Sequence, residues 1–212
     1  MTRHLLPLIL VSTAIVFAPS TQAAVIVANT GTSTGAGGQA SATSLLGVRF
    51  ITPTVATELT SASGQFEALG SPNLTMFLYN ELLGVPGTAL ATLGSQTYSG
   101  LQQTLTFTPG SPVALAASTA YYLVVACTNC AQSVTGNNWH QRGPATLSGL
   151  AGSSATAGIL FSGDNGATWG VFQTTRTPLS QVNGNVVSDV PEPATFGLMT
   201  AALALGAWLR KK

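Results

Sequence analysis

Short apolar or alternating runs, separated by glycine, proline, asparagine and serine, fill the chain from residue 24 to residue 187. In LTMFLYN, the side chains of Leu74, Met76 and Leu78 fall on one face and the intervening side chains on the other, which is the period of a β-strand. The other predicted strands are LLGVRFIT, ATELTSASGQF, QTLTFTP, AYYLVVAC, AGILFS, WGVFQTT and LSQVNGNVV. None of these segments has a helical period.

This spacing predicts an all-β domain over residues 24–188, built as a two-sheet sandwich of jelly-roll-like type. About 160 residues suffice to bury a sizeable core in one domain. The stretch AVIVANTGTSTGAGGQASATS, from Ala24, is predicted as a strand followed by a loop, because its second half is mostly Gly, Ser and Thr. No internal repeat is present in the sequence.

Residues 1–23 are predicted to be a signal peptide. Arg3 supplies the positive start, Leu5 to Ala18 the apolar core, and Thr21 and Ala23 the small residues before cleavage by a signal peptidase between Ala23 and Ala24. The alternative is a first transmembrane helix, which Pro7 and the short apolar core disfavour.

Residues 189–212 end the chain in an apolar stretch with a basic tip. Ala194 to Leu209 carry no charge, and a helix of that length covers about 24 Å of a hydrocarbon core of about 30 Å. Proline cannot lie inside the helix, so the prolines before Ala194 mark its start. Basic residues favour the cytoplasmic side, so we expect a transmembrane helix with the body outside.

The elements of this tail carry a family resemblance: Val190, Pro191, Glu192 and Pro193, then a short apolar helix, then Arg210, Lys211 and Lys212. Together they resemble the PEP-CTERM sorting signal of Gram-negative bacteria that form biofilms and exopolysaccharide. The resemblance implies an inner-membrane-anchored precursor, processing near Pro-Glu-Pro by an exosortase-type enzyme, and a mature form at the cell surface or in the extracellular matrix. The alternative is a plain C-terminal anchor.

The region between Val55 and Trp169 carries a second resemblance. Its pieces are a strand ending in Leu78-Tyr79-Asn80, a Pro86-Gly87 turn, a Tyr121-Tyr122 strand and the later SGDNGATW. Jointly they resemble the choice-of-anchor R domain of bacterial surface proteins. That family has no assigned catalytic activity, so the resemblance implies an architecture and a location and leaves the ligand open.

Composition narrows the list of partners. Charged residues make up 6% of the chain, against about a quarter in ordinary soluble proteins. Between Ala24 and Val187 there are three arginines, four acids and no lysine. Nucleic-acid binding needs clustered Lys and Arg, so nucleic acid is excluded as an expected partner.

The segment SGDNGATW matches the Asp-box pattern, formed by Ser162, Asp164, Gly166, Thr168 and Trp169. We expect a hairpin in which the Asp accepts backbone N–H bonds, the Gly permits a positive φ, and the Trp lies beneath the turn. A calcium site there would need six or more oxygen ligands, and nearby carboxylates are missing, so the motif is interpreted as structural.

Cys127 and Cys130 follow a predicted strand as CTNC. In an oxidising compartment a disulfide across the turn is expected, and its four-residue loop contributes only about 2 kcal/mol. A redox pair would need a helix N-terminus, and zinc would need two further ligands when His140 is the one histidine left after the leader. No metal and no cofactor are expected.

The sequence contains only weak signals for a catalytic site. A Ser-His-acid triad would have to use His140, and no Gly-x-Ser-x-Gly elbow is present. A glycosidase needs two facing carboxylates, and the sequence does not indicate which of its acids face each other. Those acids are Glu58, Glu67, Glu81 and Asp164, with Asp189 in the tail linker.

Trp139, His140 and Arg142, in a predicted polar loop, are the best candidates for a glycan-binding patch, because an aromatic platform beside hydrogen-bond donors suits sugars. The favoured interpretation is nevertheless an ordinary loop with a buried Trp. The sequence thus favours a non-enzymatic protein of the bacterial envelope or exopolysaccharide and biofilm matrix, with a cell-surface carbohydrate-binding module as the second hypothesis. Exopolysaccharide is the candidate partner.

Overall fold

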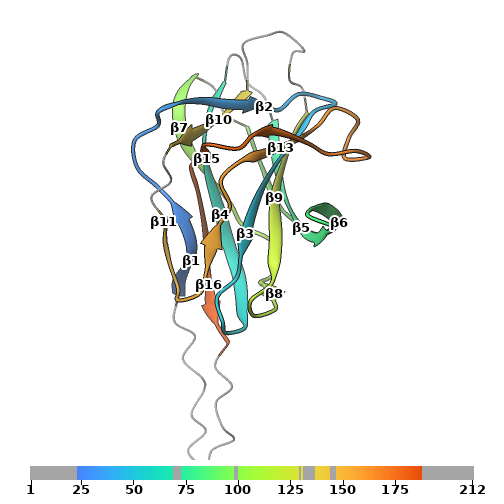
Figure 1. Ribbon diagram of the computed structural model, residues 1–212. Helices are drawn as coiled ribbons and strands as arrows, with labels where there is room; N and C mark the ends of the chain where they lie inside the picture. Colours follow the sequence, from blue (N-terminus) through green and yellow to red (C-terminus); the bar gives the residue numbers. More distant parts are fainter. Residues whose placement is uncertain are drawn as a thin grey trace, which may run out of the picture. The chain divides into compact units, whose positions relative to one another are not determined.

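The structure is a computed structural model that describes residues 23–68, 73–97, 100–128, 130, 137–143 and 147–187 (Figure 1). These residues form strands and no helix, and the strands pair antiparallel in two sheets. The prediction of an all-β, sandwich-like fold is therefore confirmed. The segments predicted as the leader core and the sorting tail, 1–22 and 188–212, lie outside the described residues.

Sheet A has nine strands, which come from both ends and the middle of the chain. They are β1 (Ala23–Asn29), β2 (Gly35–Gln39), β4 (Thr57–Ala68), β7 (Gly100–Phe107), β8 (Val113–Leu115), β10 (Asn137–Arg142), β11 (Leu147–Gly149), β15 (Thr177–Pro178) and β16 (Ser180–Val186).

Sheet B has seven strands, several of them the most apolar runs of the sequence. They are β3 (Leu45–Ile51), β5 (Asn73–Leu82), β6 (Val85–Thr97), β9 (Ala120–Thr128), β12 (Ser154–Ala155), β13 (Ile159–Ser162) and β14 (Gly170–Gln173).

Each apolar run predicted as a strand contains one, and the alternation in β5 is confirmed. Leu74, Met76 and Leu78 are fully buried between the sheets, whereas the intervening side chains face outward and are half-buried. They share one core with Phe50 from β3, Phe107 from β7 and other side chains of both sheets. A single apolar layer therefore holds the two sheets together.

Two expectations of loops are corrected. Strand β2 forms inside the predicted Gly-rich loop, and β10 forms where a polar loop was predicted. The two strands pair with each other. A Cβ at Gly37 would lie 2.2 Å from the carbonyl oxygen of Trp139, so the glycine content that indicated a loop instead permits close approach of two strands.

Strand β4 organises sheet A because it pairs along both of its edges. One edge pairs with β8 and β7. The other edge pairs first with β16, up to Gly64, and then with β10, from Phe66 onward. Strand β16 in turn lies between β4 and β1, so the first and last strands of the described fold are hydrogen-bonded neighbours (Figure 1).

The outer faces of the two sheets differ in chemistry. On sheet B, a second apolar cluster of Leu45, Tyr122 and Val124 packs against Trp169 and the aromatic side chains of β5. On sheet A, the outward positions of β4 and β16 carry mostly serine, threonine, glutamine and asparagine, with Glu58 and Glu67 near the two ends of β4. Sheet A therefore presents a polar and mostly uncharged face.

Among the described residues, no helix has the length and apolar character needed to cross a membrane. The predicted transmembrane helix lies in the segment 188–212 and is not part of this observation.

Candidate functional site

The predicted glycan-binding patch at Trp139, His140 and Arg142 is not a surface loop. All three residues lie on β10, and Trp139 is 0% exposed, with its ring centroid 5.3 Å from that of Phe66. A buried indole offers no face to a sugar, so the prediction of a Trp139 platform is wrong. The interpretation as a buried Trp agrees with the observed burial, although Trp139 lies in a strand and not in a loop.

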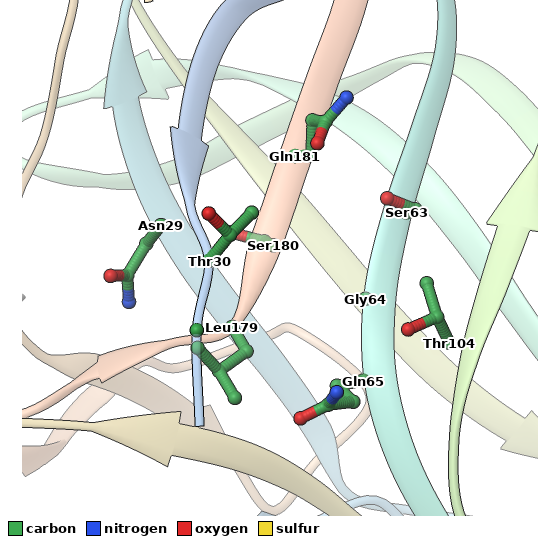
Figure 2. Close-up of a pocket in the computed structure, with 10 residues that line it drawn as sticks. Asn29, Thr30, Ser63, Gly64, Gln65, Thr104, Leu179, Ser180 and Gln181 are labelled. Carbon is green, nitrogen blue, oxygen red and sulfur yellow. The ribbon is translucent and has the colours of Figure 1, made fainter. Parts of the chain in front are cut away.

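A shallow pocket of about 190 Å³ lies on sheet A beside this buried motif (Figure 2). It forms where the partner of β4 changes from β16 to β10. Gln65 lies at that change, and its N–H bonds the carbonyl of Leu179 at 3.1 Å, where the chain crosses from β15 to β16. The pocket is lined by Asn29, Thr30, Gly31, Ser63, Gly64, Gln65, Thr104, Leu179, Ser180 and Gln181.

Trp139 supports this pocket from beneath. Its Nε1 donates to the carbonyl of Leu179 at 3.0 Å. A Cβ at Gly64 would lie 2.6 Å from the ring of Phe66 and 3.0 Å from Trp139 Nε1, so glycine lets β4 pass directly over these two rings. The buried aromatic pair therefore shapes a polar surface hollow.

Arg142 holds one wall of the pocket. Its Nη1 donates to the carbonyl of Thr30 at 3.2 Å. Gly31 has a φ of 128°, and a Cβ there would lie 2.0 Å from the same nitrogen. The guanidinium thus occupies the space that a side chain at Gly31 would fill, and it fixes the Thr30–Gly31 segment from behind.

His140 binds the segment that follows Gly31. Its ring links the side chains of Ser33 and Glu67. Its Nδ1 lies 2.8 Å from Ser33 Oγ and its Nε2 lies 3.0 Å from Glu67 Oε2. The Ser33 hydroxyl also lies 3.1 Å from the Gly35 carbonyl and accepts the Gly35 N–H at 3.2 Å. Ser33, His140 and Glu67 thus form a hydrogen-bonded series that connects the segment after β1 with β10 and β4, and Ser33 does not line either of the two pockets described here.

Side-chain amides on this face are held by hydrogen bonds. Gln181 Nε2 donates to Asn183 Oδ1 at 2.6 Å, and Asn183 Nδ2 donates to Ser61 Oγ at 3.1 Å. Gln102 Nε2 donates to Gln65 Oε1. These bonds use one polar atom of the Gln65 amide and one of the Gln181 amide. The second polar atom of each amide is therefore held in a fixed orientation before any ligand binds.

A second pocket of about 190 Å³ lies on sheet B and is lined by Arg49, which belongs to the one Arg–acid pair of the described residues. Arg49 bonds Glu81 and donates from Nη1 to Thr156 Oγ1 at 3.1 Å. The bond to Glu81 raises the pKa of Arg49 above its ordinary value. Burial raises the pKa of Tyr122, whose hydroxyl donates to the carbonyl of Gly84.

The Asp box begins at Ser162, the last residue of β13, and its other residues lie in the loop between β13 and β14. Asp164 Oδ1 accepts the N–H of Thr168 at 2.9 Å, and Oδ2 accepts the Thr168 hydroxyl at 2.7 Å. The Thr168 side-chain bond is the largest cause that lowers the pKa of Asp164 to about 2, followed by its backbone bond and the bond from Ser162. Gly166 has a φ of 91°, and Trp169 packs on the outer apolar cluster of sheet B.

Cys127 and Cys130 are brought together as a close pair at the end of β9. Their Cα atoms are 5.8 Å apart, which is within the usual range for a disulfide. Both residues are buried at the margin of the core. Among the described residues, no group of three His, Cys, Asp or Glu side chains has a metal-binding arrangement.

The acids considered for a glycosidase do not converge on either pocket. Glu67 pairs with His140, and Glu81 pairs with Arg49. Asp164 is used by the Asp box, and Glu58 lies near the opposite end of β4 from Glu67. Asp189 lies outside the described residues.

The remaining sequence-predicted sites also fall largely outside the described residues. These are the sorting positions Val190, Pro191, Glu192, Pro193, Arg210, Lys211 and Lys212. The predicted cleavage site is partly visible, because β1 begins at Ala23 and Ala24 pairs with Gly184 of β16.

The pocket on sheet A was missed in the sequence. The alternation in SASGQF, from Ser61 to Phe66, indicated an outward polar row, and that is the signal that could have found Ser63 and Gln65. No comparable signal is present for the other residues that line the pocket. Its walls join β1, β4, β7 and β16, which are strands far apart in the chain.

Comparison of the chain with models of known protein families finds no match, and no curated protein matches it significantly.

Proposed function

We propose that this chain is an exported, non-enzymatic protein of the bacterial envelope or extracellular matrix, delivered by its C-terminal signal. The observation that carries the proposal is the sequence of the tail, in which Val-Pro-Glu-Pro precedes a charge-free stretch and a basic tip. The N-terminal leader supports export. The close cysteine pair suits an oxidising compartment, where disulfides persist.

We further infer that the two sheets form a jelly roll. The eight longest strands support this inference through their order, β1-β16-β4-β7 in sheet A and β3-β9-β5-β6 in sheet B. In this order the first strand lies beside the last, and successive strands alternate between sheets except at the β5–β6 hairpin. Two interlocked Greek keys have this property.

A structural or adhesive role is supported by how the reactive groups are used. Glu67, His140, Glu81, Arg49 and Asp164 each bind another side chain of the chain itself. The exposed face of sheet A consists mainly of neutral amides and hydroxyls, with Glu58 and Glu67 near the ends of β4, and such a face is compatible with a hydrated, uncharged polymer around the protein. Fold alone does not assign a function, so the role depends on these sites and the tail.

Mass spectrometry of the protein recovered from cells tests the sorting part of the proposal. We expect the mature chain outside the inner membrane to end near Pro191-Glu192-Pro193 and to begin at Ala24. A chain that still ends in Lys212 outside that membrane would contradict processing. A Glu192→Ala variant with an otherwise unchanged tail should accumulate as the unprocessed precursor.

Deletion of the gene tests the matrix part. We expect biofilm cohesion to fall, and expression of the chain in trans to restore it. Unchanged cohesion of the deletion strain in a matrix-forming culture would count against a structural role.

A further inference from the structure

We propose that the sheet A pocket binds a neutral segment of a polysaccharide. The proposal concerns the purified chain and does not depend on the tail or its processing. It replaces the sugar-binding position expected at Trp139, which is buried.

The lining of the pocket selects the class of ligand. Its side chains are four hydroxyls, three amides and one leucine, and none is charged. An anion or a cation would find no lining group of opposite charge. Sugar hydroxyls both donate and accept, and amides and hydroxyls offer both functions in return.

Several lining groups have hydrogen-bonding capacity available. Ser63 and Thr104 lie on adjacent strands, and no described side chain or backbone group bonds their hydroxyls. Figure 2 shows both hydroxyl oxygens turned toward the strand that carries Ser180 and Gln181. With one end of Gln65 and of Gln181 already bonded, the pocket presents a fixed set of partners at little ordering cost.

Dimensions and surroundings favour a piece of a polymer over an isolated small molecule. The volume of about 190 Å³ is below the range of about 300–1,000 Å³ typical of pockets that enclose a drug-sized ligand. The pocket lies on an open sheet face, where Thr106 and Asn183 extend the same neutral chemistry to either side. A chain lying across the face would therefore place one unit in the hollow and its neighbours on the sheet.

The buried motif on β10 positions this site. Trp139 fixes Leu179, and Arg142 fixes the carbonyl of Thr30, so neither residue needs to touch the ligand. Arg142 acts as a positioning residue for the Thr30–Gly31 wall. Its replacement by lysine keeps a donor for the Thr30 carbonyl, whereas replacement by alanine removes it.

Isothermal titration of the full chain in mild detergent tests the proposal. The probes are dextran, laminarin and galactomannan as neutral glycans, alginate as an anionic glycan, and an uncharged Gly-Ser peptide. We expect saturable binding of at least one neutral glycan and none of alginate or the peptide.

Pocket variants locate the binding. Gln65→Ala and Gln181→Ala should each weaken it roughly three- to tenfold, as expected for loss of one hydrogen bond. Thr104→Tyr places a ring over the pocket from an exposed strand position and should abolish binding. Arg142→Ala should weaken binding, and Arg142→Lys should restore most of it.

Gln173→Ala is the matched control, because Gln173 is an amide that lines the pocket on sheet B. It should bind like the wild type, and the circular dichroism spectra of all variants should agree. Failure of all three neutral glycans to bind overturns the proposal, as does unchanged binding by Thr104→Tyr. Preferential binding of alginate or the peptide overturns the assignment to a neutral glycan.

Discussion

Gly64 affects both the packing of the core and the shape of the surface pocket. It lies in the middle of β4, directly above the rings of Phe66 and Trp139. A larger residue would have to displace one of these packed rings. The polar pocket above and the aromatic pair below thus depend on the same missing Cβ.

Replacement of Gly64 by alanine should lower the free energy of unfolding by about 1–3 kcal/mol, because the added methyl group overpacks the site. Urea unfolding followed by tryptophan fluorescence measures the change. Gly110→Ala is the control, since nothing lies within 4 Å of a Cβ at that position. Equal stability of the two variants would show that the rings move aside without cost.

Asp164 is predicted to contribute to stability in a pH-dependent way. Its pKa falls from 3.8 to about 2 in the folded chain, chiefly through the bonds from Thr168. A lowered carboxyl pKa means that the contribution is complete above about pH 4 and is lost as the pH falls toward 2. The apparent melting temperature should therefore drop through this window.

The Asp164→Asn variant should melt at a lower temperature than the wild type at pH 7, and the difference should shrink between pH 4 and pH 2. Thermal scans at intervals of half a pH unit measure both effects. Gln102→Ala, which removes no ionisable group and lies on the other sheet, is the control and should keep the wild-type profile in this window. A constant difference down to pH 2 would contradict the role of the ionised carboxylate.

At the scale of the element, the β9 turn with Cys127 and Cys130 illustrates a local constraint. Closing a loop of so few residues restricts the unfolded chain only slightly. We expect the double variant Cys127→Ser, Cys130→Ser to lose at most about 2 kcal/mol and to keep the same fold. Denaturant unfolding measures the loss.

Thiol counting under denaturing, non-reducing conditions completes this test. The wild-type chain purified from an oxidising compartment should show no free thiol, and the reduced chain two. A stoichiometric bound metal, or failure of the double variant to fold, would contradict a modest structural role for the pair.

Elements differ in how far they could be predicted from the sequence. Strand β5 was predictable because strict alternation and apolar content agree, and its buried positions follow directly. Strand β10 was not, because NNWHQR is polar and its one large apolar side chain, Trp139, is buried by residues from distant strands, among them Phe66 of β4. Strand β2 was not predictable either, because a Gly-rich composition occurs both in flexible loops and in closely packed strands.

The pocket illustrates the same limit for sites. Outward positions along β4 follow from its alternation, but the neighbours of those positions come from strands more than 30 residues away. The contact of His140 with Ser33 spans 107 residues and that with Glu67 spans 73. Spacing in the sequence contains no signal for such contacts, which appear only when the sheet order is known.

At the scale of the whole molecule, β16 joins the parts of sheet A. It pairs with β1 along one edge and with β4 along the other. Deletion of residues 180–187 should therefore expose both neighbouring strands and abolish cooperative unfolding. Circular dichroism and limited proteolysis measure this loss. Deletion of the short edge strand β11, at residues 147–149, is the control and should preserve the cooperative transition.

The pairing of β1 with β16 also sets the order of events when the chain is made. Strand β1 is the first to emerge from the ribosome, yet its principal partner is the last strand, more than 150 residues later. Sheets that join such distant strands form slowly, because long loops must close before the contacts that reward them. Sheet A of this topology can therefore be completed only after nearly all of the chain has been synthesised. Under the export that we propose, this delay would leave the chain able to pass through a narrow channel before it folds.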